Sequence, residues 1–338
     1  MARLAGVSQK TVSRVFNGEQ YVTSEVRERV LAAARSLGYR PNQAARALNT
    51  GRTHRLGVVS LGSALFGPAS LLGGLERIAR REGYDLSIVS TFENEPDGIR
   101  EAIEILLEQG VEGIVLSEPI DDQHPIEISV DVPVLTFGRF PELAGPGVIV
   151  AGFDGVAGAH AATKHLLDLG HETVLHVAGP QRWWAAQDRI EGWRQALRAA
   201  GAPESLCLEG DWSARSGYLA GQAIAQQSGA TAIFAGNDDM AIGVIRALIG
   251  AGARVPEDVS VVGYDDIPSA EFLNPPLTTV AQEFERAAAE GLSRLISVIA
   301  AGDAPAEAFS AEAPNLIVRD STAPPLGSHI KGAMLLDR

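Results

Sequence analysis

The 338-residue sequence is poor in cysteine and contains no long apolar run. Its single cysteine, Cys207, excludes intramolecular disulfides and zinc sites built from several thiolates, which favours a reducing compartment. No apolar run approaches the roughly 18 residues needed to cross a bilayer. The first residues also lack the apolar stretch of a signal peptide. We therefore expect a cytoplasmic protein without a membrane partner.

The sequence also lacks the common motifs of enzyme active sites. It contains no Gly-Lys dipeptide, which excludes a Walker A loop, and no Gly-x-Gly-x-x-Gly, Gly-x-Ser-x-Gly or His-Glu-x-x-His. Adjacent carboxylates at 238–239 and 265–266 could suggest a glycosidase, but adjacent residues do not face each other. Four histidines are better explained as solvated or core side chains: His160, His165, His171 and His176. We expect no enzyme, no cofactor and no metal site.

The charge of the chain is unevenly distributed. With 28 basic and 42 acidic residues the net charge is −14, which by itself argues against a nucleic-acid partner. Residues 1–56, however, contain ten of the basic residues and three of the acidic ones, a net charge of +7, so the rest of the chain carries −21. This asymmetry indicates a small module that meets a polyanion, joined to a large acidic body with another role.

The basic head has the pattern of a helix-turn-helix. Ser8 is a good N-cap for a helix whose apolar residues at 12, 15 and 16 would form a buried face. The opposite face carries long donors and no carboxylate: Gln9, Lys10, Ser13 and Arg14. A short helix over residues 2–6 precedes it and an amphipathic helix over residues 23–38 follows it. In this arrangement the middle helix enters the major groove of DNA, although a small helical cap with solvated basic residues has a similar pattern.

Residues 41–56 connect the head to the body as a hinge and linker. Residues 42–48 could form one short helix, followed by a stretch that contains Gly51. Isolated helices shorter than about 12 residues are marginal in water, so we expect this helix to form only where something docks against it.

Beyond residue 56 the sequence alternates between apolar strands and amphipathic helices. The expected strands are residues 56–61, 86–90, 113–116, 132–136, 173–177, 231–234 and 259–263, and the first two helices are residues 70–83 and 96–110. Such alternation is typical of βαβ units, and two consecutive sets indicate two doubly wound lobes with a cleft between them. The expected fold is an all-α helix-turn-helix head with a hinge helix, followed by an α/β body of two parallel-sheet lobes.

Polar residues gather in loops that follow several of these strands. Residues 210–218 place a tryptophan in a Gly-bounded loop, while residues 236–240 and 263–266 follow strands directly. Sugars are recognised by an aromatic face and by planar polar side chains. Doubly wound α/β folds bind their ligands at the carboxyl ends of the strands, where these loops lie. Each loop alone could be a helix cap, but together they favour a sugar site.

The sequence resembles the lactose-repressor (LacI/GalR) family of bacterial transcription regulators almost to the C-terminus. The resemblance is carried by residues 5–18 (AGVSQKTVSRVFNG), 37–42 (LGYRPN) and 45–48 (ARAL). It implies a DNA-binding head on two lobes like those of periplasmic sugar-binding proteins, with three chain crossings between the lobes. Leu48 would wedge into a minor-groove step and kink the DNA. By resemblance, the DNA-contacting residues are Ser8, Gln9, Lys10, Thr11, Arg14, Asn42, Arg46 and Leu48.

The resemblance also implies an effector site, and it looks closest to the lactose-repressor subgroup. Residues 64–68 (ALFGP), 189–193 (RIEGW) and 210–213 (GDWS) carry this closer likeness. Gly155 stands where many relatives have Asn, and Trp183 and Trp184 fit the cleft mouth or lobe packing equally well. The implied effector contacts are Asp154, Arg189, Trp212, Asn237, Asp265, Gln282, Phe284, Pro68 and Trp183. The expected effector is a galactoside or a related glycoside.

These assignments give the expected domains. They are residues 1–40 for the helix-turn-helix, 41–56 for the hinge helix and linker, 57–169 with 283–312 for the N-terminal lobe, 170–282 with 313–325 for the C-terminal lobe, and 326–338 for a flexible tail. Met1 stands where relatives often have a valine preceded by further residues, so we expect the native chain to begin upstream. Residues 321–338 lack a heptad repeat, which favours a homodimer on a palindromic operator over a tetramer.

The expected mechanism is linkage between sugar binding and DNA binding. A glycoside would close the lobes, disfavour the hinge helices and lower the affinity for the operator. In relatives that use corepressors, the ligand instead raises the affinity for the operator. Removal of the head should abolish DNA binding, and residues 57–338 alone should still bind sugar. Two other classes stay open, a transport-type sugar-binding protein and a sugar-processing enzyme.

Overall fold

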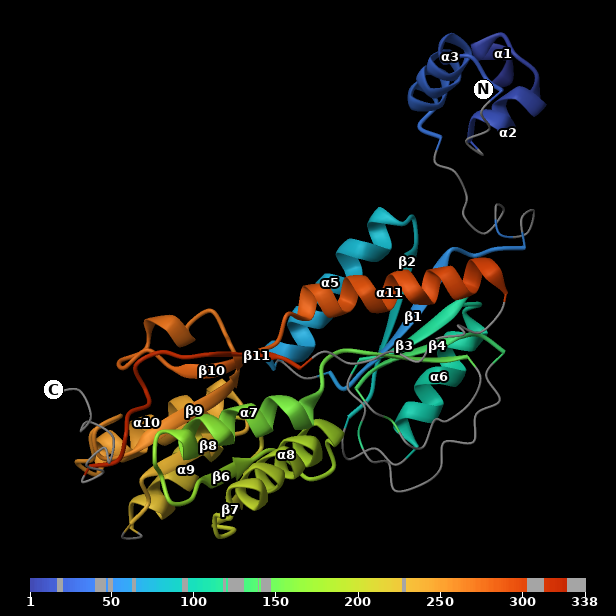
Figure 1. Cartoon of the computed structure of the whole chain (residues 1–338). Helices are drawn as coiled ribbons and strands as arrows, with labels where there is room; N and C mark the ends of the chain where they lie inside the picture. Colours follow the sequence, from blue (N-terminus) through green and yellow to red (C-terminus); the bar gives the residue numbers. More distant parts are fainter. Residues whose placement is uncertain are drawn as a thin grey trace, which may run out of the picture. The chain divides into compact units, whose positions relative to one another are not determined.

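The chain forms two compact units, Met1–His54 and Arg55–Arg338, in the computed structural model (Figure 1). The hinge residues Asn42, Arg46 and Leu48 and the tail beyond residue 326 lie outside the described residues, so the expectations for them stay predictions. The structure describes residues 1–16, 21–39, 47, 51–62, 65–92, 97–117, 120, 131–138, 140, 147–226, 229–302 and 313–326.

The first unit contains the three helices that the sequence predicts: α1 (Ala2–Ala5), α2 (Gln9–Phe16) and α3 (Ser24–Ser36). Gly6 ends α1 in the left-handed conformation, with φ 63°, which glycine adopts without steric cost. Arg29 of α3 donates hydrogen bonds to the carbonyl oxygens of Ala5 and Gly6, at 2.6 and 3.2 Å, and so fixes α3 against the turn between α1 and α2. The small core is formed by Ala5, Val15, Val30 and Ala33.

The second unit begins with a five-stranded parallel sheet in the order β2-β1-β3-β4-β5. Helices α5 (Phe66–Arg81) and α11 (Phe284–Ala301) pack together over one face of this sheet, and α6 (Gly98–Glu108) covers the other (Figure 1). Its strands are β1 (Arg55–Ser60), β2 (Asp85–Ser90), β3 (Gly113–Leu116), β4 (Val134–Phe137) and β5 (Val148–Ala151). Strands β1 and β3 are almost wholly buried, as expected for a parallel sheet with helices on both faces.

A second sheet has six strands in the order β11-β10-β9-β8-β6-β7, all parallel except for the antiparallel pair β10 and β11. Helices α7 and α8 cover one face, while α9 and α10 pack on the other (Figure 1). The strands are β6 (Leu175–Ala178), β7 (Cys207–Glu209), β8 (Ala232–Ala235), β9 (Ser260–Asp265), β10 (Thr278–Ala281) and β11 (Asn315–Ile317). The helices are α7 (Gly155–Asp168), α8 (Trp184–Ala200), α9 (Ala214–Ala225), α10 (Asp238–Gly250) and the 3-10 turn η1 (Ala270–Phe272).

Helix α7 corrects one expected boundary. We expected residues 57–169 to belong to the N-terminal lobe, but α7 packs on α8 and contacts strands β8 to β11 of the second sheet. The chain therefore crosses between the lobes directly after β5, and α7 is the first element of the C-terminal lobe. It returns to the first sheet after β10 and crosses a third time between α11 and β11.

The two lobes meet at a backbone bridge beside their cleft. Ile120, which follows β3, pairs in antiparallel fashion with Trp183, the N-cap of α8. Both side chains are buried, with 2% and 6% of their surface exposed. The bridge therefore ties the loop before α8 to the first lobe.

Candidate functional site

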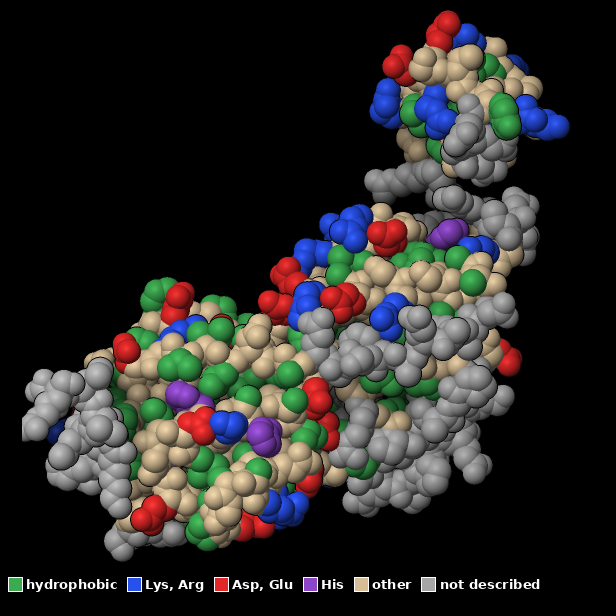
Figure 2. All heavy atoms as spheres, viewed as in Figure 1, with side chains coloured by type: hydrophobic (Ala, Val, Ile, Leu, Met, Phe, Trp, Pro, Cys, Tyr) green, Lys and Arg blue, Asp and Glu red, His purple; other side chains and the backbone are tan. Residues whose placement is uncertain are grey.

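Helix α2 presents an exposed polar face on the first unit. Gln9, Lys10 and Arg14 are exposed, while Val15 on the opposite side is buried in the core. Ser8 caps the helix, because its Oγ accepts a hydrogen bond from the backbone N–H of Thr11 at 3.1 Å. Figure 2 shows the Lys and Arg side chains of this unit at its surface. The predicted DNA contacts on α2 therefore share one accessible face, with Thr11 partly buried beside it.

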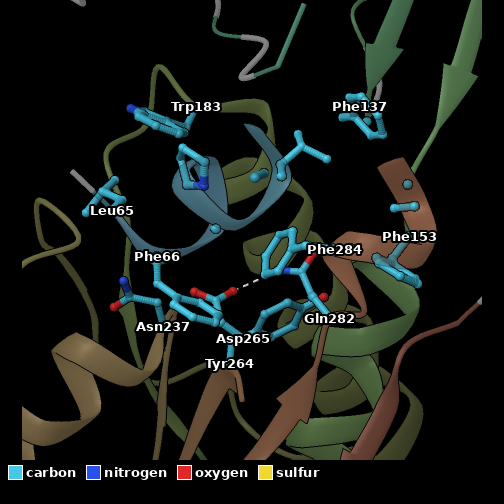
Figure 3. Close-up of a pocket in the computed structure, with 18 of the residues that line it drawn as sticks. Leu65, Phe66, Phe137, Phe153, Trp183, Asn237, Tyr264, Asp265, Gln282 and Phe284 are labelled. Atoms are coloured by element: carbon cyan, nitrogen blue, oxygen red, sulfur yellow. Dashed lines mark hydrogen bonds between the residues drawn. The ribbon is translucent and has the colours of Figure 1, made fainter. Parts of the chain in front are cut away.

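A cavity of about 150 Å³ lies between the two lobes of the second unit (Figure 3). It lies at the carboxyl ends of strands from both sheets, where open α/β sheets bind ligands. The first lobe contributes the start of α5 and the ends of β3 and β4, and the second lobe contributes α8, Asn237 after β8 and the last two residues of β9. The start of α11 completes the wall.

One end of the cavity is polar and buried. Arg189 of α8 has 7% of its surface exposed, and its Nη2 lies 3.5 Å from Oδ1 of Asp265, the last residue of β9. Gln282, just after β10, donates a hydrogen bond from Nε2 to the same carboxylate oxygen at 2.7 Å. Burial raises the pKa of Asp265 to about 6, while the Arg189 charge opposes that rise. At neutral pH this end therefore holds a guanidinium, an ionised carboxylate and an amide.

Aromatic rings enclose the Arg189 guanidinium. Its Cζ lies 3.9 Å from the ring centroid of Tyr264 and 5.0 Å from that of Trp212. Such cation–π contacts gain strength when the pair is desolvated. Burial raises the pKa of Tyr264 to about 12, so the phenol stays neutral. Trp212 in turn meets the ring of Trp183 edge to face at 5.8 Å, which extends the aromatic wall to the bridge between the lobes.

Asn237 lines the cavity and also holds Trp212 in place. Its Nδ2 donates a hydrogen bond to the Trp212 carbonyl oxygen at 3.0 Å, and its Oδ1 caps α10 by accepting from Met240 N–H at 2.9 Å. Trp212 has φ 69°, which a tryptophan rarely adopts. A Cβ on Gly179 would overlap the Trp212 ring, so this glycine provides the space for it.

The structure brings eight of the nine predicted effector residues to the cavity wall: Pro68, Trp183, Arg189, Trp212, Asn237, Asp265, Gln282 and Phe284. Asp154 is not among the described lining residues, and its carboxylate instead caps α7 by accepting from Ala157 N–H at 2.8 Å.

Sequence reasoning missed two groups of lining residues. Phe66, Phe137 and Phe153 come from the first lobe and its border, and Figure 3 shows Phe137 on the side of the cavity opposite Asp265. Asp188 and Tyr264 flank predicted residues in the sequence. Phe137 ends β4 and Phe153 follows β5, so the rule that ligands bind at strand ends could have found both.

The paired carboxylates do not form a catalytic couple in the cavity. Asp238 is fully buried away from it, where it accepts hydrogen bonds from Ile267 N–H at 2.9 Å and from Thr279 Oγ1 at 2.6 Å. Burial raises the pKa of Asp238 to about 8. Asp266 instead pairs with Arg319 at 2.7 Å. His171 and His176 are core side chains with hydrogen-bond partners, as expected.

A helical unit with an exposed polar helix, joined to a two-lobed α/β unit with a polar and aromatic cavity, defines the class of ligand-controlled DNA-binding regulators. Residues 1–42 match the family described as bacterial regulatory proteins, lacI family, and residues 163–322 match the periplasmic binding protein-like domain. The chain belongs to the LacI family of bacterial regulatory proteins. Among the described residues, no helix is both long and apolar enough to span a membrane.

Several curated relatives cover most of the chain. The HTH-type transcriptional repressor PurR of Haemophilus influenzae (strain PittEE) is 32% identical, over 95% of this chain and 97% of its own length. The ribose operon repressor of Escherichia coli (strain K12) is 34% identical over 83% of this chain and 86% of its own length. The lactose operon repressor of the same strain is 32% identical over 88% of this chain and 83% of its own length.

Solved structures agree with the fold. The crystal structure of the lac repressor dimer bound to operator and the anti-inducer ONPF superposes with a TM-score of 0.85 at 30% identity, over 95% of this chain and 97% of the other. The complex of the transcriptional regulator CelR with cellobiose gives a TM-score of 0.72 at 31% identity, over 95% and 98%.

Proposed function

We propose that the protein is a transcriptional repressor that binds a palindromic operator as a homodimer and is controlled by a glycoside in the cavity. The observation that carries the proposal is the cavity, in which the buried pair of Arg189 and Asp265, joined by the half-buried Gln282, faces aromatic side chains. Guanidinium, carboxylate and amide groups match sugar hydroxyls, and aromatic rings match the apolar face of a pyranose. A DNA partner implies a cytoplasmic protein, and we propose no enzymatic activity.

The exposed face of α2 supports the DNA-binding role. Gln9 suits adenine, and Lys10 or Arg14 suits guanine or phosphate. One such helix reads only a few base pairs, so two copies on a palindrome are needed for a specific site. The lac repressor structure named above is a dimer bound to operator, which supports the same assembly here. We propose that Asn42, Arg46 and Leu48 add contacts from the hinge.

The cavity wall supports a glycoside larger than a pentose. Relatives named for ribose and for lactose are similarly identical to the chain, so overall identity does not select the sugar. Of the 19 aromatic residues in the sequence, eight line this one cavity. They are Phe66, Phe137, Phe153, Trp183, Trp184, Trp212, Tyr264 and Phe284. Such a wall offers apolar faces to a sugar ring and to a second ring attached to it, as in a galactoside.

The two sites would be coupled by linkage. The cavity is built from both lobes, so a bound glycoside favours the lobe arrangement in which both walls contact it. We propose that this arrangement disfavours the DNA-bound hinge. A coupling of about 1–3 kcal/mol corresponds to a change in operator affinity of about 5- to 150-fold, and operator weakens glycoside binding by the same factor.

An operator selected from random-sequence DNA with the purified protein provides the test. We expect a palindromic consensus, and we expect galactose, lactose, cellobiose or a related glycoside to weaken binding to it in mobility-shift titrations. Failure to select any sequence would favour a transport-type sugar-binding protein. Conversion of a sugar to product would favour an enzyme, and a sugar that tightens DNA binding would reverse the sign of the coupling.

A further inference from the structure

The turn that follows β9 holds the Asp265 carboxylate of the cavity on an unusual backbone. Asp265, the last residue of β9, has φ 110°, and Asp266 has φ 55°. Residues other than glycine rarely adopt positive φ, and such conformations persist only where the surrounding structure over-determines them. The contacts that hold this turn therefore decide where the Asp265 carboxylate lies.

Arg319, two residues after β11, binds both ends of the connection between β9 and β10. Its Nη2 donates a hydrogen bond to Oδ1 of Asp266 at 2.7 Å, and its Nη1 donates to the Leu277 carbonyl oxygen at 2.8 Å. These two acceptors are the first and the last residue of the connection, residues 266–277. The side chains of Arg319 and Asp266 are only 19% and 27% exposed, so salt screens their attraction less than that of a surface pair. One guanidinium therefore fixes the whole connection at its ends.

The backbone of Arg319 is itself anchored to the sheet. Its N–H donates to Oγ1 of Thr278, the first residue of β10, at 2.9 Å. Ser321 accepts from the Thr278 N–H at 2.8 Å and donates to the Val261 carbonyl oxygen of β9 at 2.6 Å. The Arg319 side chain therefore starts from a segment that is bonded to both strands.

Arg319 and Asp266 are not among the described residues that line the cavity. Asp265 itself is also held by Gln282, whose N–H donates to the Asp265 carbonyl oxygen at 3.4 Å and whose Nε2 donates to its carboxylate at 2.7 Å. Any effect of Arg319 on a ligand would therefore pass through the turn and not through direct contact.

We infer that Arg319 is a positioning residue of the effector site: through Asp266 it keeps the Asp265 carboxylate where sugar hydroxyls can donate to it. Hydrogen bonds weaken steeply when their angle or distance is wrong, and bonds from hydroxyls to an ionised carboxylate are stronger than those between neutral groups. The planar fork of arginine suits this role because it presents two N–H groups to two acceptors at once. This inference rests on the proposed function and deepens its account of the effector site.

The test measures sugar affinity in variants of the Arg319–Asp266 pair. Galactose, lactose and cellobiose are titrated calorimetrically into the full-length wild type, Arg319→Met and Asp266→Asn. Asparagine tolerates the left-handed conformation, so Asp266→Asn removes the ion pair but not the backbone preference. Each variant should bind the sugar about 10- to 100-fold more weakly, the range for loss of a hydrogen bond to a charged group. The double variant should bind no more weakly than the weaker single variant, because both changes remove the same contact.

Two further variants separate positioning from stability. Arg319→Lys should recover part of the affinity, because it restores the charge beside Asp266 but not the planar fork. The matched control is Arg254→Met, which breaks another arginine–aspartate pair of the same lobe, that with Asp258 at 2.6 Å. Neither residue is among the described lining residues, and affinity should stay unchanged. Thermal melting of all variants checks that the titrated protein is folded.

Amide hydrogen exchange tests the turn without any sugar. The Ile267 N–H donates to the Asp238 carboxylate at 2.9 Å, and the Gln282 N–H donates to the Asp265 carbonyl oxygen, so both amides report on the turn. In Arg319→Met without ligand both should exchange about 10-fold faster than in the wild type, because the turn opens locally more often. Arg254→Met should leave their exchange unchanged.

Three results would overturn the inference. Unchanged exchange at both amides in Arg319→Met would show that Arg319 does not hold the turn. Folded Arg319→Met protein with faster exchange but wild-type sugar affinity would leave Arg319 a structural role alone. Absence of binding by all three sugars to the wild type would refute the proposed glycoside, and the role of Arg319 toward it would fall as well. This last result is seen in the wild type alone, so it is distinct from a failure of the variants.

Discussion

The guanidinium of Arg189 lies 3.9 Å from the centroid of the Tyr264 ring, and both side chains are buried. The same guanidinium faces Asp265. Arg189 therefore neutralises the buried Asp265 carboxylate and also packs against the neutral Tyr264 ring. The effector site thus contains a buried ion pair, in which either charge would destabilise the fold if the other were removed.

Removal of the Arg189 charge should cost stability as well as sugar binding. In Arg189→Met the Asp265 carboxylate stays buried without its cation, and breaking such a pair lowers the free energy of unfolding by about 3–5 kcal/mol. The loss should be smaller at pH 5, because Asp265 then takes up a proton: its pKa is about 6 beside Arg189, and removal of that opposing charge raises the pKa further. Urea denaturation measures both effects. The control is Arg194→Met, on the same helix as Arg189. It breaks an exposed ion pair with Glu204 and should lower the free energy of unfolding by only about 0–1 kcal/mol. Equal losses in the two variants would contradict the prediction.

A methyl group at Gly179 should disturb the site without touching a ligand. In Gly179→Ala the new Cβ overlaps the Trp212 ring, which must move, and such overpacking costs about 1–3 kcal/mol. Glycoside affinity should fall because Trp212 lines the cavity. Gly73→Ala is the matched control, since its Cβ would meet only the flexible end of Arg77 at 3.5 Å. Inside α5 it should stabilise the protein by about 0.5–1 kcal/mol and leave binding unchanged.

Asp238 should make the protein less stable as the pH rises. Burial raises its pKa from 3.8 to about 8, so the folded state keeps a proton that the unfolded chain releases. Stability from this group is complete below pH 4 and declines as the pH rises to about 8. The buried histidines have lowered pKa values and act in the opposite direction, but only below about pH 6.5. Between pH 7 and 8 the unfolding free energy of the wild type should therefore fall.

Asp238→Asn isolates this group. An amide accepts the hydrogen bond from Ile267 N–H and donates to Thr279 Oγ1, so the fold should be kept while the pH dependence between 7 and 8 disappears. Urea denaturation at several pH values measures the slope. A variant with the wild-type slope would show that another group is responsible.

Different residues on the exposed face of α2 should determine the affinity for DNA and the selectivity for its sequence. Lys10→Ala should weaken binding to all DNA sequences and reduce the salt dependence by about one phosphate contact. Gln9→Ala should relax the preference at one base pair, at a cost of about 1–3 kcal/mol on the selected operator. Salt titrations on selected and altered operators separate the two. Lys164→Ala, in the acidic unit, is the control for loss of a lysine, and an equal effect there would refute the assignment.

The two units should function separately. A fragment of residues 55–338 should bind a glycoside as the full chain does and should not bind DNA, because it retains the cavity and an acidic surface. It starts at residue 55 instead of 57, since β1 begins at Arg55. Calorimetry and mobility shifts measure the two activities. Operator binding by this fragment would contradict the role of α2.

The sequence predicted the layered fold well, and its errors have local causes. Residues 113–116 were predicted as a strand with both ends correct, since a short apolar run there is bounded by turns. Helix α5 begins at Phe66, not at Ser70, because Pro68 occupies its first turn, where no intrahelical N–H partner is needed. Helix α7 was assigned to the wrong lobe because the crossing before it leaves no mark in the local pattern.

The cavity was only partly predictable. Residues that follow strands, such as Asn237 and Asp265, could be found from their position. Asp154 has the same signature, but an Asp before a helix is also the signature of an N-cap, and capping is what the structure shows it doing. Asp188 lies within a helix, where only tertiary packing opposite Gly155 turns it toward the cavity.

The placement of the tryptophans has an optical consequence. Three of the four, Trp183, Trp184 and Trp212, line the cavity, whereas Trp193 is fully buried in the C-terminal lobe and donates to the Val174 carbonyl oxygen. Indole emission responds to polarity and to nearby quenching groups, and three of the four indoles of this chain lie where a ligand in the cavity would alter both. Ligand binding in the cavity can therefore be measured by intrinsic tryptophan fluorescence, without any attached label.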